Sequence, residues 1–207
     1  MGDHKEAFTK VYEECHWGDN KEKGYKGSSG EGSSIEYNLA TYIPFIRAFF
    51  KIKGIKSVVD VGCGDWRCGD LIYRQDPIDY TGVDAYEALI KRNSEQWSQH
   101  KWMCMDGFKE RASLPSADLL ILKDVLQHWT TAEIYEFLDD ITTSKKFKYI
   151  LIVNCSFQKA DDEDIPEHII NTYRHRPLSA NFFPLKKYGA KILTKYKTKE
   201  ACLIETS

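Results

Sequence analysis

Three aspartates stand at or near the ends of short apolar runs of the chain: Asp60, Asp84 and Asp106. The first run passes directly into a turn that contains Gly62 and Gly64, and glycines at such a turn allow the backbone to approach a ligand closely. Ligands of open parallel sheets bind beyond the carboxyl ends of the strands. The three carboxylates are therefore expected to surround one ligand.

Each carboxylate suits a different hydrogen-bond donor. Asp60, two residues before the first glycine, suits an ammonium group better than a phosphate. Asp84, twenty residues after Gly64, is placed to accept from two ribose hydroxyls. Asp106 is placed to accept from the amino group of adenine. The third glycine of a dinucleotide-binding G-x-G-x-x-G pattern falls on Arg67, which disfavours NAD or FAD. The ligand indicated has a ribose, an adenine and an amino acid end.

A second group of polar residues follows the fourth apolar run. Asp124 and His128 are four residues apart and share one face if the segment is helical. His128 is then a candidate general base, with Asp124 orienting its imidazole, and the reverse assignment also stands. A helix-capping aspartate beside a surface histidine is the alternative without function. A magnesium-type ion between Asp124 and Asn154 is a further alternative that we do not favour, because Cys155 stands where another ligand is needed.

The elements that must position these residues are readable from the pattern. Apolar runs predict strands at 57–61, 80–83, 101–105, 118–122 and 149–153. Helical patterns are expected at 4–16, 39–54, 86–98 and after a Thr130–Glu133 capping box, with Pro44 kinking or restarting the second. This alternation implies an α/β fold with a parallel sheet covered on both faces. Segments 191–196 and 201–204 predict a terminal antiparallel hairpin, whose lysines, Lys199 included, are expected to be solvated.

This constellation resembles the class I S-adenosylmethionine-dependent methyltransferases. Residues 58–66 look like their first motif, D-x-G-x-G, although Trp66 stands where a third glycine often occurs. The resemblance implies a Rossmann-like, mainly parallel seven-stranded sheet with helices on both faces and a C-terminal antiparallel hairpin. It also implies S-adenosylmethionine as cofactor and S-adenosylhomocysteine as product. The cofactor contacts that it implies are Asp60, Gly62, Cys63, Gly64, Asp84, Ala85, Asp106, Gly107 and Lys123.

More loosely, the chain resembles small glycan-modifying methyltransferases of bacteria and large DNA viruses, through Trp17-Gly18, residues 123–128 and residues 173–178. That resemblance implies a sugar hydroxyl as acceptor. It also implies that Gly32, Ser33 and Tyr37 close over the cofactor. By composition alone, the Gly/Ser-rich segment 18–34 is either a flexible linker or a lid. RNA or protein acceptors, or a non-catalytic methyltransferase-like binding module, are the alternative functions.

Length, charge and cysteine content limit the possible domain organisation, partners and location of the protein. The 207 residues, 42% hydrophobic, fit one domain, with 1–54 as helices and lid and 55–207 as a catalytic core that carries an acceptor-side insertion at 157–188. A net charge of −2 disfavours a nucleic-acid partner, and a small molecule or glycan is the partner that the resemblance implies. No apolar run is long enough to span a bilayer, and residues 1–6 are polar, so we expect no signal sequence. The six cysteines form no C-x-x-C pair, so we expect reduced thiols and a cytoplasmic protein.

Overall fold

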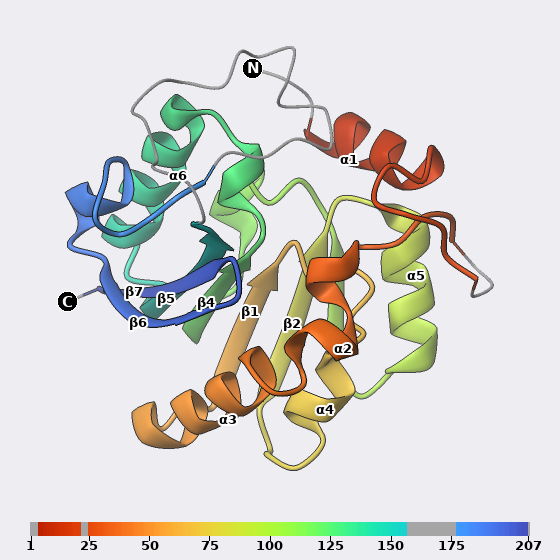
Figure 1. The fold of residues 1–207 in the computed structure, drawn as a ribbon, viewed down its shortest axis with the longest axis horizontal. Coiled ribbons are helices and arrows are strands. Elements are labelled where there is room, and N and C mark those ends of the chain that lie inside the picture. Colours follow the sequence, from red (N-terminus) through yellow and green to blue (C-terminus); the bar gives the residue numbers. More distant parts are fainter. Residues whose placement is uncertain (1–3, 22–24, 157–176, 207) are drawn as a thin grey trace.

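The structure is a computed structural model that describes residues 4–21, 25–156 and 177–206. Seven strands form one sheet in the order β3-β2-β1-β4-β5-β7-β6 (Figure 1). The strands are β1 (Ser57–Val61), β2 (Asp79–Asp84), β3 (Lys101–Cys104), β4 (Ala117–Lys123), β5 (Phe147–Cys155), β6 (Lys191–Tyr196) and β7 (Lys199–Glu205). The first five pair in parallel, and β7 runs antiparallel to β5 and β6. The expected mainly parallel sheet with a terminal hairpin is confirmed.

Four of the helices lie where the sequence predicted them, and two short ones, Ile35–Asn38 and Gly69–Tyr73, were not predicted. They are α1 (His4–Glu13), α2 (Ile35–Asn38), α3 (Tyr42–Lys53), α4 (Gly69–Tyr73), α5 (Glu87–Gln96) and α6 (Thr131–Thr143), with short 3-10 turns η1 (Glu31–Ser33), η2 (Arg111–Ser113), η3 (Leu126–His128) and η4 (Leu185–Tyr188). Pro44 lies in the first turn of α3, where a missing N–H is tolerated, so the helical pattern restarts there. Gly54 caps α3 in the left-handed conformation, and the Thr130–Glu133 capping box starts α6.

The central strands are apolar on both faces because helices cover both. In β4, Leu120 and Leu122 belong to the core that contains residues of α6, whereas Leu119 and Ile121 belong to the core that contains residues of α3 and α4. This burial on two sides explains the continuous apolar run that parallel strands require. No helix within residues 4–21, 25–156 and 177–206 combines the length and the apolar character that crossing a membrane needs.

The chain reverses its direction across the sheet at β1, which lies between β2 and β4. At such a switch point the loops leave the two neighbouring strands in opposite directions and open a crevice at the carboxyl edge. Helix α1 lies above this edge (Figure 1). The fold therefore brings the N-terminal segment over the strand ends that carry the predicted site residues.

Candidate active site

A cavity of about 340 Å³ lies at the carboxyl edge of the sheet. Nine of the predicted residues line it: Gly62, Gly64, Asp84, Ala85, Asp106, Gly107, Lys123, Asp124 and His128. Two others, Asp60 and Cys63, line an adjoining cavity of about 60 Å³ instead. Gly62 and Lys123 belong to the walls of both cavities. The strand ends thus bring nine of the predicted residues to one cavity, and Asp60 and Cys63 to the cavity beside it.

The glycine turn after β1 is tightly enclosed. Gly62 and Gly64 have φ values of 72° and 58°, which other residues rarely adopt. A Cβ on Gly62 would lie 2.5 Å from Val125, and a Cβ on Gly64 would lie 2.5 Å from the hydroxyl of Ser29. Trp66 also has a positive φ, of 53°, and its buried ring stacks on Tyr73. The departure from the family motif is therefore accommodated by packing the side chain into the core.

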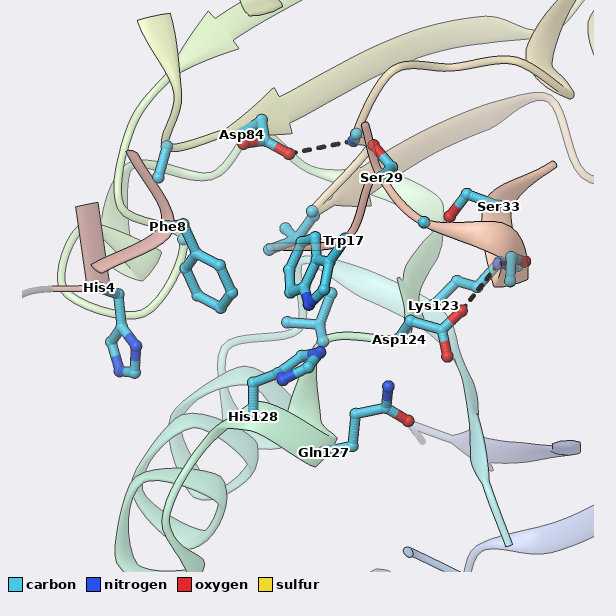
Figure 2. A pocket seen from close by; sticks show the side chains of 18 of the residues that line it. His4, Phe8, Trp17, Ser29, Ser33, Asp84, Lys123, Asp124, Gln127 and His128 are labelled. Carbon is cyan, nitrogen blue, oxygen red and sulfur yellow. Dashed lines mark hydrogen bonds and ion pairs between the residues drawn. The ribbon is translucent and has the colours of Figure 1, made fainter. Parts of the chain in front are cut away.

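Asp84 holds this turn in place from the end of β2. One carboxylate oxygen accepts from the backbone N–H of Gly64 at 3.0 Å, and the other accepts from the N–H of Tyr86 at 3.1 Å. Burial raises the pKa of Asp84, and the backbone donors oppose that rise. The carboxylate faces the cavity from a fixed position (Figure 2).

Asp106, after β3, has one satisfied and one unsatisfied oxygen. Its Oδ1 accepts from the N–H groups of Phe108 and Lys109 at 2.9 and 3.0 Å. Its Oδ2 is buried and has no hydrogen-bond partner within the described part of the chain. A buried carboxylate oxygen without a donor costs free energy until a ligand supplies one. The site therefore fits a ligand that carries an N–H donor, such as the amino group of adenine.

Asp60 points toward the second cavity. Its Oδ2 accepts from the Tyr80 hydroxyl at 3.0 Å. Burial raises the pKa of Asp60 to about 7, against the opposing effects of the Tyr80 hydrogen bond and the Lys123 ammonium. A buried carboxyl of this kind gains most from a nearby cation, so the site fits an ammonium group reaching past Gly62.

Asp124 and His128 do not share a helix face. The assumption that residues 124–128 are helical, on which their pairing was predicted, is wrong. Asp124 has a φ of 61°, outside any helix, and the 3-10 turn η3 starts only at Leu126. Its carboxylate instead binds two lysines: Lys123 Nζ lies 2.8 Å from Oδ2, and Lys199 Nζ donates to Oδ1. Burial alone raises the pKa of Asp124, but the two ammonium groups lower it to about 2.

His128 ends η3 and is buried in an aromatic wall of the cavity. Its ring lies 5.3 Å from that of Trp17 and 5.8 Å from that of Phe8, centroid to centroid. Figure 2 shows His128 on the same side of the cavity as Gln127, with Trp17 above it. The imidazole is therefore held by rings from the N-terminal segment, in contact with the cavity.

The Gly/Ser-rich segment packs onto the glycine turn. The N–H of Asp65 donates to Ser29 Oγ at 2.8 Å, and the N–H of Ser29 donates to Asp65 Oδ2 at 3.1 Å. Tyr12 of α1 shares a 2.8 Å hydrogen bond with Ser29 Oγ. The carbonyl of Gly32 accepts from Lys123 Nζ at 2.9 Å. Gly32, Ser33 and Tyr37 line the cavity, as the resemblance implied for residues that cover the ligand.

Several site residues were not predicted from the sequence. His4, Phe8, Tyr12 and Trp17 line the cavity from the N-terminal segment, Gln127 lines it from η3 and Lys199 from β7. Lys199 was expected to be solvated with the other hairpin lysines, but it is only 4% exposed. The helical pattern of 4–16 indicated that α1 has an apolar face, without indicating what that face covers.

Within residues 4–21, 25–156 and 177–206, no group of three or more His, Cys, Asp or Glu side chains is arranged to hold a metal ion. Asn154 is buried, and its Oδ1 has no partner among those same residues. Both oxygens of Asp124 are bound by ammonium groups. Of the insertion expected at 157–188, residues 157–176 lie outside the described residues.

Comparison with known proteins places the chain among transferases. Residues 42–174 match the profile of the family described as an O-methyltransferase domain. No curated protein sequence gives a match. Among solved structures, the human N-acetylserotonin methyltransferase in complex with SAM is 17% identical with a TM-score of 0.61, covering 84% of this chain and 54% of that chain. The mitomycin 7-O-methyltransferase MmcR is 16% identical with a TM-score of 0.58, covering 78% and 52%.

The present chain thus spans about half the length of those two proteins. A third similar structure is the N-terminal domain of EvdMO1 with SAH bound, 16% identical with a TM-score of 0.61, covering 100% of this chain and 98% of that chain. The same domain was crystallised in the presence of SAH and D-fucose and is then 15% identical with a TM-score of 0.59. At these identities the structural likeness shows the fold.

Proposed function

The chain belongs to the O-methyltransferase domain family, and on this premise we propose that it transfers a methyl group from S-adenosylmethionine to a hydroxyl of a sugar or another small hydroxylated acceptor. The observation that carries the proposal is the partnerless Oδ2 of Asp106 in the same cavity as the enclosed glycine turn, Asp84 and His128. These groups match the adenine, the ribose and the reacting end of such a cofactor.

The residues have separate tasks in holding the cofactor. Asp106 Oδ2 accepts from the adenine amino group, and Asp84 accepts from the ribose hydroxyls, since each carboxylate oxygen can accept a second hydrogen bond beside its backbone donor. Asp60 attracts the amino acid ammonium, and Lys123 with Lys199 attracts the carboxylate. Ala85 and Gly107 line the same wall as the two acids. S-adenosylmethionine, when bound, supplies an electrophilic methyl group.

His128 is the base that we propose for the acceptor hydroxyl. A ring nitrogen takes the proton as the oxygen becomes a nucleophile, and a positioned base of this kind contributes roughly 10²–10⁴-fold to the rate. Asp124 with a pKa of about 2 is a poor proton acceptor, so the reverse assignment loses support. We propose instead that Asp124 positions the two lysines.

The acceptor class rests on the character of the cavity wall around His128. Phe8, Trp17 and Trp129 supply flat apolar surfaces, and Gln127 and His128 supply the polar groups. A mostly apolar pocket with a few directed polar groups suits a small ring-shaped molecule better than a polymer backbone. The likeness over nearly the whole of the EvdMO1 domain crystallised with D-fucose also supports a sugar.

The organisation and location of the chain are proposed on similar grounds. Residues 1–54 form the segment that covers the site, and 55–207 form the catalytic core, in one methyltransferase domain. All six cysteines are free, which suits a reducing compartment and supports a cytoplasmic enzyme.

A labelled-methyl transfer assay tests this function. Calorimetry with S-adenosylmethionine comes first, because absence of binding would refute the enzymatic role altogether. The enzyme with labelled cofactor is then offered glycans, small phenols, RNA and protein. Label in glycans or small hydroxylated compounds supports the proposal, and label only in RNA or protein contradicts the acceptor class. Cofactor binding without transfer to any of them would favour a binding module. Activity that survives EDTA is expected, because ammonium groups already bind Asp124.

A further inference from the structure

Gln127 contributes a polar group to the cavity that the proposed mechanism leaves unused. It is the middle residue of η3, between Leu126 and His128, and is only 4% exposed. Its Oε1 accepts from the backbone N–H of Cys155, at the end of β5, at 3.0 Å. This bond crosses from the β4 exit to the β5 exit and fixes the orientation of the side-chain amide.

The fixed orientation determines what the other end of the amide can do. With Oε1 held by the Cys155 N–H, the planar amide also fixes the direction of Nε2, and Figure 2 shows Nε2 directed into the cavity toward Asp124. No hydrogen bond from Nε2 is found within the part of the chain that the structure describes. Because Gln127 borders the cavity, a ligand oxygen placed there could accept from this N–H donor, and a bound ligand that excluded water without offering an acceptor would leave the donor unsatisfied at a cost.

We propose that Gln127 Nε2 donates to an acceptor oxygen adjacent to the hydroxyl that His128 deprotonates, so that the enzyme selects acceptors with two vicinal oxygens. The inference rests on the proposed function. Gln127 and His128 are consecutive residues whose side chains both line the cavity, one as a fixed donor and the other as a base. Sugars and catechols share the vicinal-oxygen chemistry, whereas simple alcohols and phenols lack it.

Matched acceptors and matched variants test the inference. The probes are a methyl glycoside with the analogue deoxygenated at the carbons beside the methylated hydroxyl, and catechol with phenol, each assayed for labelled-methyl transfer. One of these two pairs is expected to contain a substrate. For that pair we expect the wild-type kcat/KM to be roughly 10- to 100-fold higher for the compound with vicinal oxygens than for its matched analogue. Gln127→Met removes the donor without adding charge and should erase most of that preference. Gln99→Met makes the same change at an exposed position and should leave it intact.

Gln127→Glu separates donation from a structural role. The carboxylate can still accept from the Cys155 N–H but cannot donate, and unchanged binding of S-adenosylhomocysteine would show that the added charge has not disrupted the site. We expect Gln127→Glu to lose the vicinal preference as Gln127→Met does, while the Kd for S-adenosylhomocysteine stays within about two-fold. Retained preference in both variants, equal use of vicinal and single-hydroxyl compounds by the wild type, or transfer to no vicinal compound would overturn the inference.

Failure of this inference and failure of the proposed function give different results. If S-adenosylmethionine does not bind, the function itself is wrong. If it binds and a hydroxyl is methylated without regard to Gln127, the function stands and the role of Gln127 falls. A loss of cofactor binding in Gln127→Met would move the residue to the cofactor site and would also contradict the inference. Comparison of methyl transfer to the glycosides with transfer to catechol shows whether the vicinal oxygens belong to a sugar or to an aromatic diol.

Discussion

At the scale of single residues, Asp124 controls the charge at one end of the cavity. Its carboxylate binds the ammonium groups of Lys123 and Lys199, whose side chains are only 14% and 4% exposed. Asp124→Asn would leave both cations without a counter-charge. Removal of one partner from a buried ion pair costs about 3–5 kcal/mol, so we expect a loss of unfolding free energy of that size at pH 7, measured by urea denaturation.

The same substitution has a pH dependence with a definite sign. The pKa of Asp124 is about 2 in the folded chain and near its ordinary value when unfolded. A carboxylate with a lowered pKa stabilises the fold above its unfolded pKa, and this contribution disappears as pH falls toward the folded value. The stability gap between wild type and Asp124→Asn should therefore narrow between about pH 4 and pH 2. Asp79→Asn, at an exposed ion pair, serves as control, and an equal loss there would contradict the assignment.

His128 gives the sharpest catalytic prediction. His128→Gln keeps a polar side chain of similar size but cannot accept a proton, so kcat should fall by roughly 10²–10⁴-fold. Steady-state assays measure kcat, and calorimetry with S-adenosylhomocysteine checks that the variant still binds the product of the cofactor. His100→Gln, away from the cavity, should keep wild-type kcat; unchanged kcat in His128→Gln would remove the residue from the mechanism.

The sequence was informative about some of these residues and misleading about others, for physical reasons. Asp84 and Asp106 follow apolar runs, so the parallel sheet alone places them at one edge. Lys199 was misjudged because it fell in the turn predicted between residues 196 and 201, whereas β7 already begins at Lys199. Its register partner is Cys155, at the end of β5, and the sequence did not show that pairing. The link from Asp124 to His128 failed because it assumed helical backbone where Asp124 has a positive φ.

At the scale of elements, Ser29 is the residue that joins the segment before α2 to both α1 and the glycine turn. Ser29 Oγ accepts from the N–H of Asp65 and shares a hydrogen bond with Tyr12. Ser29→Ala removes both bonds, at about 1 kcal/mol or slightly more. We expect roughly five-fold weaker binding of S-adenosylhomocysteine by calorimetry and faster tryptic cleavage at Lys26. Ser94→Ala, on the exposed side of α5, is the control, and identical behaviour of the two variants would mean that the segment does not cover the ligand.

Elements were predicted better than their contacts. The capping box of Thr130 and Glu133 and the cap at Gly54 are local signals, and both helix ends are where those signals put them. The position of α1 depends on a contact that no local pattern contains: His4 Nε2 lies 3.1 Å from Glu133 Oε1, and both residues are buried. Composition identified the Gly/Ser segment, but its partner Asp65 belongs to another part of the chain.

At the scale of the whole molecule, the cavity joins parts of the chain that are far apart in sequence. Its walls come from α1, from the segment before α2, from the ends of β1 to β4, and from the start of β7. A ligand that binds there contacts both the sheet and the segment that covers it. Binding to the folded state alone must therefore stabilise the molecule against global unfolding.

Thermal denaturation with S-adenosylhomocysteine measures this coupling. At a concentration of about 100 times Kd the ligand adds about 2.7 kcal/mol, which raises Tm by about 5–10 °C for a domain of this size.

Asp106→Asn supplies the matched test. The amide oxygen can still accept from Phe108 and Lys109, which puts an NH₂ group where the partnerless Oδ2 faces the ligand. The new NH₂ group and the adenine amino group are both donors and cannot bond to each other. The Kd for S-adenosylhomocysteine should therefore rise roughly 10- to 100-fold, with the Tm of the unliganded protein nearly unchanged. An undiminished shift in this variant would show that Asp106 does not read the adenine amino group, and no shift in the wild type would mean that the cavity binds something else.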